Sequence, residues 1–506
     1  MNKLKLLASY AGSAYVGLIG ILILPLYIDY MGVEAFGLVG FFAMLQAWSN
    51  LLDVGLTPTA ARETARFNGG STNAGQYRAL MASLEGIFLF VAVIVAVGIA
   101  GASEFIGTEW LHSDGLPDNE IIFSVIIMGG IIALRWLGGL YRGVITGGEQ
   151  IVWLSVFNIV IATIRFILVL PVLVYLGSSP LHFFIYQLCT AILELTILVV
   201  KAYKLMPTSR LSFSRIPKWY ILKPVATFSL SIAGTTIIWI LVSQIDKLLL
   251  SNLLSLAEYG QYTLAVMAAS GLMLLGAPVS VIIMPLMTRL AAEGHHQAVI
   301  NVYKQATQLV CVVVVSAASI MCFFAVALLY AWIGDKAIAE NIASIFIFYV
   351  MGNAALALAA FPYYLQYAKG NLRLHVIGNI CFAMVLIPTV IWATRSYGGI
   401  GAAAVWFFSN FVFLCFWVPF VHSKIAPGLN REWYGVDIVS IAFPIITVSY
   451  LLHITLPESS DRWDGLLMVF VSSAITLIVG FMCAKSLRNL LFKQIKLWIR
   501  NNYASK

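Results

Sequence analysis

Charged residues are scarce in this chain. Asp, Glu, Lys and Arg make up 10% of its 506 residues, whereas hydrophobic residues make up 61%. A soluble domain usually contains about a quarter charged residues, so this composition excludes a water-soluble globular protein and indicates a surface that contacts lipid. The connections between hydrophobic segments are too short to fold as a soluble catalytic domain, which favours a transporter over a membrane-anchored enzyme.

Motifs for nucleotide hydrolysis, zinc binding and nucleophilic catalysis are absent from the sequence. It has no phosphate-binding loop, no zinc-ligand spacing and no nucleophile elbow. Its six cysteines are scattered through hydrophobic segments without paired spacing, which indicates buried thiols. We therefore expect a protein that is not an enzyme and that uses no cofactor or metal ion, with a proton or sodium gradient left open as its energy source.

Long hydrophobic segments recur along the whole chain. A segment of about 20 apolar residues crosses a hydrocarbon core of about 30 Å as a helix. These segments are too long and continuous for barrel strands, so we predict an all-α polytopic membrane protein with about 14 transmembrane helices. The predicted spans are residues 7 to 28, 37 to 57, 80 to 100, 121 to 141, 151 to 176, 182 to 200, 226 to 250, 261 to 286, 305 to 331, 342 to 365, 374 to 394, 400 to 421, 436 to 456 and 465 to 484.

Basic residues lie mainly on one side of this topology. When loops are assigned alternately to two sides, most of the 30 Lys and Arg residues fall on the side of the N-terminus. The exceptions are Lys336, Arg395 and Arg462 on the opposite side, and Arg135, Arg165 and Lys247 in or near spans. The positive-inside rule then places both termini in the cytoplasm. The net charge of +8 thus has a topological cause and gives no reason to expect a nucleic-acid partner.

An internal repeat accompanies this arrangement. Aligning VEAFGLVG (33 to 40) with LAEYGQYT (256 to 263) also places Arg66 on Arg289. Because both halves would start on the same side of the membrane, the repeat is parallel and predicts two six-helix lobes. The predicted parts are an N-terminal lobe (1 to 204), a basic cytoplasmic linker (205 to 223), a C-terminal lobe (224 to 421) and two further helices with a basic cytoplasmic tail (422 to 506).

Two segments resemble a known transporter family. LPLYIDYMGVEAFGLVGFFAMLQAWSNLLDVGLTPTAARETAR (24 to 66) resembles the opening of the Wzx-type O-antigen and polysaccharide flippases. These belong to the multidrug/oligosaccharidyl-lipid/polysaccharide (MOP) exporter superfamily. The similar features are a proline that ends the first helix, Gly-x-Glu-x-Phe-Gly, Asp-x-Gly-Leu near the end of the second helix, and an Ala/Arg segment after it. SQIDKLLLSNLLSLAEYGQYTLA (243 to 265) resembles the corresponding start of the second lobe.

The resemblance implies a flippase of the bacterial cytoplasmic (inner) membrane. Its cargo would be an undecaprenyl-pyrophosphate-linked oligosaccharide, the repeat unit of an O-antigen, as in lipopolysaccharide, or of an exopolysaccharide. Alternating access between the lobes would carry the cargo to the outer leaflet, through a cationic central cavity that receives the pyrophosphate. Membrane lipids would surround the protein, and the resemblance leaves open two protein partners, a polysaccharide polymerase and a chain-length regulator.

Arginines within the spans are the candidate substrate ligands. Arg165 lies near the middle of the span 151 to 176, where an ionised side chain costs several kcal/mol unless it meets water, a counter-charge or a substrate. Asn158, seven residues earlier, shares its helix face, and Arg135 and Arg142 repeat this spacing on the preceding span. A guanidinium keeps its charge and binds phosphate oxygens in pairs. These four side chains are therefore predicted to receive the pyrophosphate.

Three carboxylates in spans, Glu85, Glu194 and Asp246, are the candidate ion-coupling residues. A carboxylate in a membrane site can exchange protons or bind Na⁺ and so couple transport to an ion gradient. Structural roles are the alternative. Glu85 or Glu194 would then pair with Arg135 or Arg165, and Asp246 would pack near the outer end of its helix.

Aromatic residues cluster in FPYYLQYAKGNLR (361 to 373). Tyr363 and Tyr367 are candidates for stacking on sugar rings, with Lys369 near the entrance. Because tyrosines are enriched at every membrane interface, an aromatic belt is the favoured explanation.

Three other functions stay open from the sequence. A flippase for lipid II of peptidoglycan is a related reading with a different cargo. A multidrug or cation exporter needs a site dominated by acidic residues, whereas the deepest charges here are arginines. A membrane glycosyltransferase or polymerase needs a sizeable outer loop with catalytic side chains, and the longest outer loop is short and lacks Arg.

Overall fold

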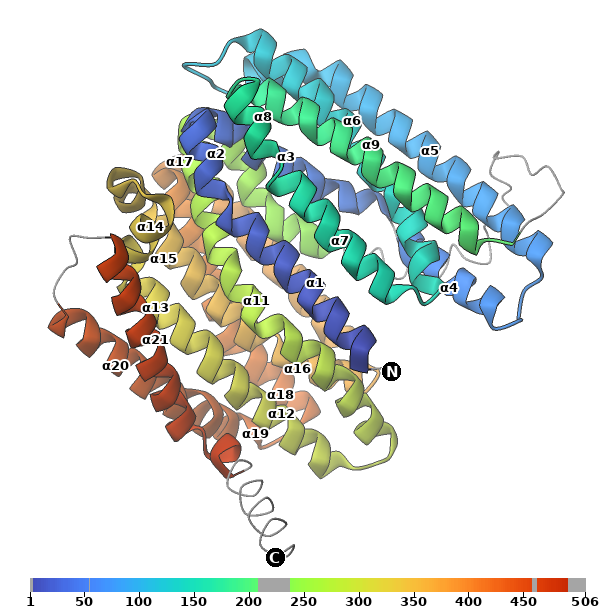
Figure 1. Cartoon of the computed structure of the whole chain (residues 1–506). Coiled ribbons are helices and arrows are strands. Elements are labelled where there is room, and N and C mark those ends of the chain that lie inside the picture. The colour runs from blue at the N-terminus through green and yellow to red at the C-terminus, as the bar shows by residue number, and fades with distance from the viewer. Residues whose placement is uncertain (1–2, 54, 208–236, 457–461, 490–506) are drawn as a thin grey trace, which may run out of the picture. The chain divides into compact units, whose positions relative to one another are not determined.

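The fold is helical throughout the described part of the chain. The computed structural model describes residues 3–53, 55–207, 237–456 and 462–489, and in these ranges the chain forms no β-strand. Figure 1 shows the helices arranged as long, closely packed rods. The predicted all-α membrane fold is confirmed, and the chain is a multi-pass membrane protein.

Twelve segments of the described residues are long and apolar enough to cross a membrane. They differ most from the predicted spans in two places. One segment, Arg373–Ile425, joins the predicted spans 374 to 394 and 400 to 421. The predicted span 226 to 250 lies partly outside the described residues, which continue from a helix over residues 237–253. The count of about 14 spans stays a prediction.

A kink at Gly398 separates the two predicted spans that this segment joins. The helix α17 (Arg373–Val412) is interrupted at Gly398, which adopts φ 58° and ψ −143°, a conformation outside the helical region. Residues with a Cβ rarely adopt it, whereas glycine does so at little cost. The backbone folds tightly here, because a Cβ on Gly401 would lie 2.3 Å from the Ala393 carbonyl oxygen. The helix is thus kinked sharply at this point without a separate loop.

The chain divides into two compact units, Met1–Leu264 and Ala265–Lys506. The division falls within α11, and the predicted boundaries at 204, 223 and 421 stay predictions. Most of the predicted linker lies outside the described residues. The first unit contains the helix over residues 237–253, the start of α11 (Leu256–Ala292) and the elements α1 (Lys3–Leu22), α2 (Leu24–Met31), α3 (Val33–Ser49), η1 (Asn50–Asp53), α4 (Leu56–Asn68), α5 (Ala74–Phe105), η2 (Ile106–Trp110), α6 (Asp118–Gly147), α7 (Ile151–Phe166), α8 (Val169–Tyr175) and α9 (Pro180–Leu205).

The second unit holds the rest of α11 and the remaining helices. In it, α15 packs against α13, α14 and α17, and the last two helices pack on α13 and α14. Its elements are α12 (His296–Val310), η3 (Cys311–Val315), α13 (Ser316–Phe323), α14 (Ala325–Ile333), α15 (Lys336–Ala359), α16 (Phe361–Ala368), α17, η4 (Phe413–Trp417), α18 (Val418–Ile425), α19 (Leu429–Glu432), η5 (Trp433–Val439), α20 (Ser440–Thr455) and α21 (Arg462–Cys483).

Helix α6 is the centre of the first unit. It packs against α4, α5 and α9, and Figure 1 shows α5, α6 and α9 side by side. Buried side chains such as Leu84, Phe88, Leu140 and Leu198 form the shared core of these helices. Helix α1 packs along α7. The two arginines of α6 are therefore held on the best-buried helix of this unit.

Glycines let α4 approach the backbone of α6. A Cβ on Gly143 would lie 2.6 Å from the Thr57 carbonyl oxygen, and one on Gly147 would lie 2.2 Å from that of Ala61. Such small residues at four-residue spacing are typical of close helix contacts in membranes. The contact fixes the end of α6 that carries Arg142.

A second glycine contact joins α3 to the first turns of α11. A Cβ on Gly37 would lie 2.2 Å from the Leu256 carbonyl oxygen, and one on Gly260 would lie 2.4 Å from the Val33 carbonyl oxygen. The sequence repeat aligns Val33 with Leu256 and Gly37 with Gly260, so the two contacts are reciprocal. Reciprocal contacts are expected when a two-fold axis relates the contacting segments. For the rest of the chain the repeat stays a prediction.

Replacing Gly143 with Ala should destabilise the protein. The added methyl group must displace the α4 backbone, and overpacking of this kind costs about 1–3 kcal/mol. Gly98→Ala on α5 is the matched control, because a Cβ there meets nothing within 4 Å. Thermal unfolding of the purified variants should show a lower melting temperature for G143A and no decrease for G98A. Equal melting temperatures would contradict the close contact between α4 and α6.

Candidate functional site

A cavity of about 720 Å³ lies in the first unit, between side chains of α1, α6, α7 and α9. Its charged lining residues are Arg142, Arg165 and Glu194, and Asn158 adds an amide. The structure thus brings together four of the predicted site residues around one hollow. Arg135, the fifth predicted residue of this region, is not among the lining residues.

Arg142 is held on the cavity wall by two acceptors. Its Nη1 donates to the Asn158 side-chain oxygen at 2.6 Å, and its Nη2 lies 2.5 Å from Glu194 Oε1. Its guanidinium also stands over the Phe157 ring, 5.9 Å from the ring centroid. The pairing differs from the sequence-based alternative, which gave Glu194 to Arg135 or Arg165. A long arginine side chain can reach deep into the protein from the end of its helix, and its spacing along the sequence does not show how far.

Arg165 lies where the span Ile151–Tyr175 is broken. The sequence places it near the middle of a continuous helix, but α7 ends at Phe166 and α8 begins at Val169. Pro171 is the physical reason, because a proline lacks the amide hydrogen and clashes with the carbonyl four residues earlier, here Ile167. Arg165 therefore stands at the end of a helix segment, facing the cavity.

Neighbouring helices satisfy the backbone around this break. The Ile164 carbonyl accepts a hydrogen bond from the Tyr186 hydroxyl at 2.8 Å, and the Phe166 carbonyl accepts one from the Tyr27 hydroxyl at 2.8 Å. The Gln187 amide donates to the Arg165 carbonyl at 3.0 Å. Buried carbonyls without partners are costly in a membrane, so these side chains stabilise the broken helix and with it the position of Arg165.

Gln187 also connects the two deepest arginines. While its amide nitrogen donates to the Arg165 backbone, its amide oxygen accepts from Arg135 Nη2 at 3.1 Å. Arg135 Nη1 donates to Gln46 at 2.9 Å, and its guanidinium lies 5.4 Å from the centroid of the Phe42 ring. Arg135 is thus solvated by amides and an aromatic face behind the cavity wall.

Positive charge exceeds negative charge around the cavity. In the described part of the chain, Arg142 is ion-paired with Glu194, whereas Arg135 and Arg165 form no ion pair with a carboxylate. The Nε atom of Arg165 is buried without a hydrogen-bond partner among the described residues. Buried charges normally have a counter-charge or bind a ligand. The arrangement is therefore suited to an anion that carries more than one negative charge.

The other two predicted coupling carboxylates lie elsewhere in the first unit. Glu85 of α5 accepts hydrogen bonds from the hydroxyls of Tyr203 at 2.8 Å and Tyr141 at 3.4 Å. Asp246 accepts one from the Tyr262 hydroxyl at 2.6 Å and pairs with Lys247 at 3.3 Å. Neither carboxylate lines the arginine cavity. Their role in ion coupling stays a prediction.

The aromatic candidates lie in the second unit. The ring of Tyr363 packs on the rings of Tyr367, at 6.1 Å between centroids, and His375, at 4.5 Å. The Lys369 amine donates to the Ile425 carbonyl at 2.6 Å, which ties α16 to the end of α18. The structure thus brings Tyr363 and Tyr367 together, whereas the Lys369 amine bonds to the backbone of α18, and sugar binding stays a prediction.

Comparison with known proteins identifies the family. The family model for "Polysaccharide biosynthesis protein" matches residues 5–291. The chain belongs to this family. A sequence comparison with curated proteins yields no match.

Solved structures share the fold. A structure titled "Lipid II flippase MurJ, inward closed conformation" matches with a TM-score of 0.71 and 13% identity over 96% of this chain and 100% of the other. An inward-facing multidrug resistance MATE transporter of the MOP superfamily matches with a TM-score of 0.66 and 12% identity, over 82% of this chain and 96% of the other. A MOP superfamily transporter from Pyrococcus furiosus matches with a TM-score of 0.53 and 13% identity, over 84% of this chain and 98% of the other. At these identities the likeness shows a common fold.

The Arg142–Glu194 pair should show a large coupling energy. Combining Arg142→Gln and Glu194→Gln in a double-mutant cycle should give more than about 1 kcal/mol, because the pair is short and partly buried. The exposed pair Lys336–Glu340, at 3.8 Å, is the control and should give less than about 0.5 kcal/mol. The free energy of unfolding in detergent is the quantity to measure. Additive effects at Arg142 and Glu194 would contradict the ion pair.

Proposed function

We propose that this protein is a flippase for a lipid-linked oligosaccharide whose lipid carries a pyrophosphate. The cargo would be the undecaprenyl-pyrophosphate-linked repeat unit of an O-antigen or exopolysaccharide, moved from the cytoplasmic to the outer leaflet of the bacterial inner membrane. The observation that carries the proposal is the cavity on which Arg142 and Arg165 converge with an excess of positive charge. Membership in the polysaccharide biosynthesis protein family supports the substrate class.

The guanidinium groups suit a pyrophosphate for two reasons. Each presents several N–H donors in a plane, which can bind two phosphate oxygens at once. Each keeps its charge inside a membrane protein, so the site does not lose its attraction for anions when water is excluded. The broken helix at Arg165 gives this side chain a fixed base, because Tyr27, Tyr186 and Gln187 brace the backbone around it.

Glu194 offers a route to ion coupling. Its Oε1 accepts a hydrogen bond from Arg142 Nη2, while its Oε2 is buried without a hydrogen-bond partner among the described residues. A phosphate group and Glu194 would therefore compete for Arg142. Protonation of Glu194 would release Arg142 to the substrate, so proton binding and substrate binding would favour each other. In this proposal the protonation state of Glu194 sets the substrate affinity on each side of the membrane, and a pH difference across the membrane acts on transport through it.

The charged residues of the cavity also bear on the alternative functions. A cation or multidrug exporter needs an excess of carboxylates, whereas the described cavity has two arginines and one glutamate. Lipid II also carries a pyrophosphate, and the fold is shared with a lipid II flippase, so that cargo is the second candidate. The glycan chemistry distinguishes the two, and the predicted stacking residues Tyr363 and Tyr367 would contact it. A polysaccharide polymerase and a chain-length regulator would act on the exported repeat unit.

Arg165→Gln should strongly reduce export of the glycan. Losing a hydrogen bond to a charged group costs about 1.5–3 kcal/mol, which corresponds to a decrease of about tenfold or more in transport rate. The measurement is the appearance of labelled lipid-linked oligosaccharide in the outer leaflet of vesicles that contain the variant. Arg395→Gln, at an exposed position of α17, is the control and should transport normally. Normal transport by R165Q at the same protein level would reject the substrate role.

Glu194→Gln should uncouple transport from the gradient. The amide cannot ionise, so Arg142 is available to the substrate whether or not a proton gradient is present. Transport should then proceed downhill at the same rate with and without a pH difference across the vesicle membrane. Glu340→Gln, at an exposed position of α15, is the comparison and should respond to the gradient like the parent protein. If E194Q responds to the gradient like the parent protein, Glu194 is not the coupling residue.

A further inference from the structure

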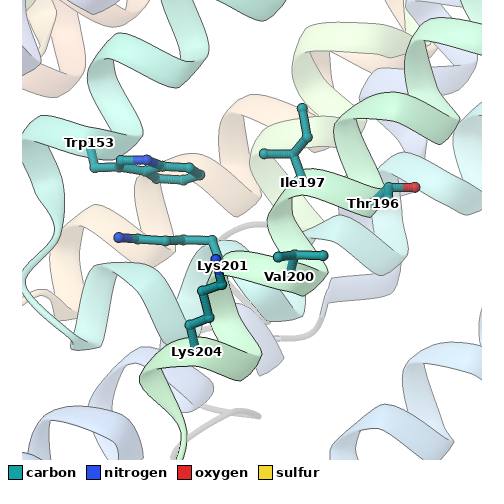
Figure 2. Close-up of a pocket in the computed structure, with 6 residues that line it drawn as sticks. All are labelled: Trp153, Thr196, Ile197, Val200, Lys201 and Lys204. Atoms are coloured by element: carbon teal, nitrogen blue, oxygen red, sulfur yellow. The ribbon is translucent and has the colours of Figure 1, made fainter.

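A second hollow lies on the first unit, between the first turns of α7 and the last turns of α9 (Figure 2). Its volume is about 400 Å³, and it shares no lining residue with the arginine cavity. Its walls are formed by Trp153 of α7 and by Thr196, Ile197, Val200, Lys201 and Lys204 of α9. We name this hollow the α7/α9 groove.

The α7/α9 groove has an apolar part and a basic part. Ile197 and Val200 lie within the apolar part of the span Pro180–Leu205, and Val200 is 50% exposed. Lys201 and Lys204 follow on the last two turns of the same span. An occupant that suits both parts has hydrocarbon next to a negative charge. A membrane phospholipid has this build, whereas a soluble anion fills only the basic part.

The basic part of the groove is held in shape by an aromatic stack. The Trp153 ring lies parallel to the Phe157 ring at 5.0 Å between centroids. Figure 2 shows the Lys201 side chain extended below the indole of Trp153, with its amine 5.1 Å from the ring centroid. Lys204, one turn further, extends toward Lys201 in the same view. The Lys201 amine thus ends under the indole, and the Lys204 amine ends nearer the base of the Lys201 side chain.

The two amines lack a counter-charge in the described part of the chain. No carboxylate lines the α7/α9 groove, and neither Lys201 nor Lys204 has an ion pair with a described carboxylate. Glu194, the nearest acidic residue on the helix, is paired with Arg142. Two lysines at the end of a span, next to a tryptophan, attract the anionic headgroups of the adjoining leaflet.

We infer that the α7/α9 groove binds an anionic glycerophospholipid. The phosphodiester of the headgroup lies between the amines of Lys201 and Lys204, and an acyl chain lies along Ile197 and Val200. The lipid is a ligand additional to the transported substrate, because the groove and the arginine cavity have separate walls. The inference does not depend on the proposed transport function, since its test measures lipid binding alone.

Native mass spectrometry of the purified full-length protein tests this inference. Phosphatidylglycerol and phosphatidylcholine with identical acyl chains are added in increasing amounts. An interfacial lysine contributes about 1 kcal/mol to binding of an anionic lipid, so K201Q should weaken phosphatidylglycerol binding about fivefold and K201Q/K204Q about 25-fold. Phosphatidylcholine binding should be unchanged, and K201R/K204R should bind phosphatidylglycerol like the parent protein.

The matched control is K424Q/K485Q, which removes the same charge elsewhere. Lys424 also stands near an aromatic ring, 5.9 Å from the centroid of Phe420, and it is not a lining residue of the α7/α9 groove. The K424Q/K485Q variant should bind phosphatidylglycerol with the affinity of the parent protein. The inference is overturned if K201Q/K204Q binds phosphatidylglycerol as tightly as the control, or if both weaken equally. It is also overturned if soluble glycerol phosphate binds as tightly as the lipid, which would identify a free-phosphate site. K201R/K204R checks that a loss reflects missing charge and not misfolding.

Discussion

The cost of placing a guanidinium group inside a membrane governs the first unit. Arg135, Arg142 and Arg165 lie on membrane-spanning helices here, and one carboxylate, Glu194, is paired with Arg142. The protein meets the cost by three different means. Arg142 has an ion pair, Arg135 has two amide acceptors and an aromatic face, and Arg165 faces a cavity at a helix break. The remaining positive charge is what the proposed substrate would neutralise.

The helix break and the glycine contacts hold the arginines in position. Pro171 ends α7 beside Arg165, and side chains from α2 and α9 satisfy the carbonyls around the break. Glycines on α6 let α4 lie against it and so fix the helix end that carries Arg142. Gln187 ties both deep arginines to α9, which also carries Glu194 at the cavity and the lysines of the α7/α9 groove. Changes at one of these places are expected to reach the others through α9.

The sequence predicts the fold class well, because a span needs only length and hydrophobicity. It predicts the grouping of Arg142, Asn158, Arg165 and Glu194 in part, since seven-residue spacing places polar residues on a common helix face. It does not predict which carboxylate meets which arginine, because this depends on how deep each helix lies and how far a flexible side chain reaches. Pro171 was a visible signal for the break at Arg165, but its partners Tyr27 and Gln187 come from helices that only the fold brings near. The role of Gly143 was visible in its spacing with Gly139 and Gly147.

Equilibrium binding to the purified protein shows whether the arginine cavity binds a pyrophosphate. Prenyl pyrophosphate, prenyl monophosphate and the uncharged prenol, all with the same chain, are compared at low and high salt. We expect the affinity to fall from pyrophosphate to monophosphate to prenol, and this difference to shrink with added salt. Equal affinity for the three lipids would show that the prenyl chain alone is recognised, and would contradict the account.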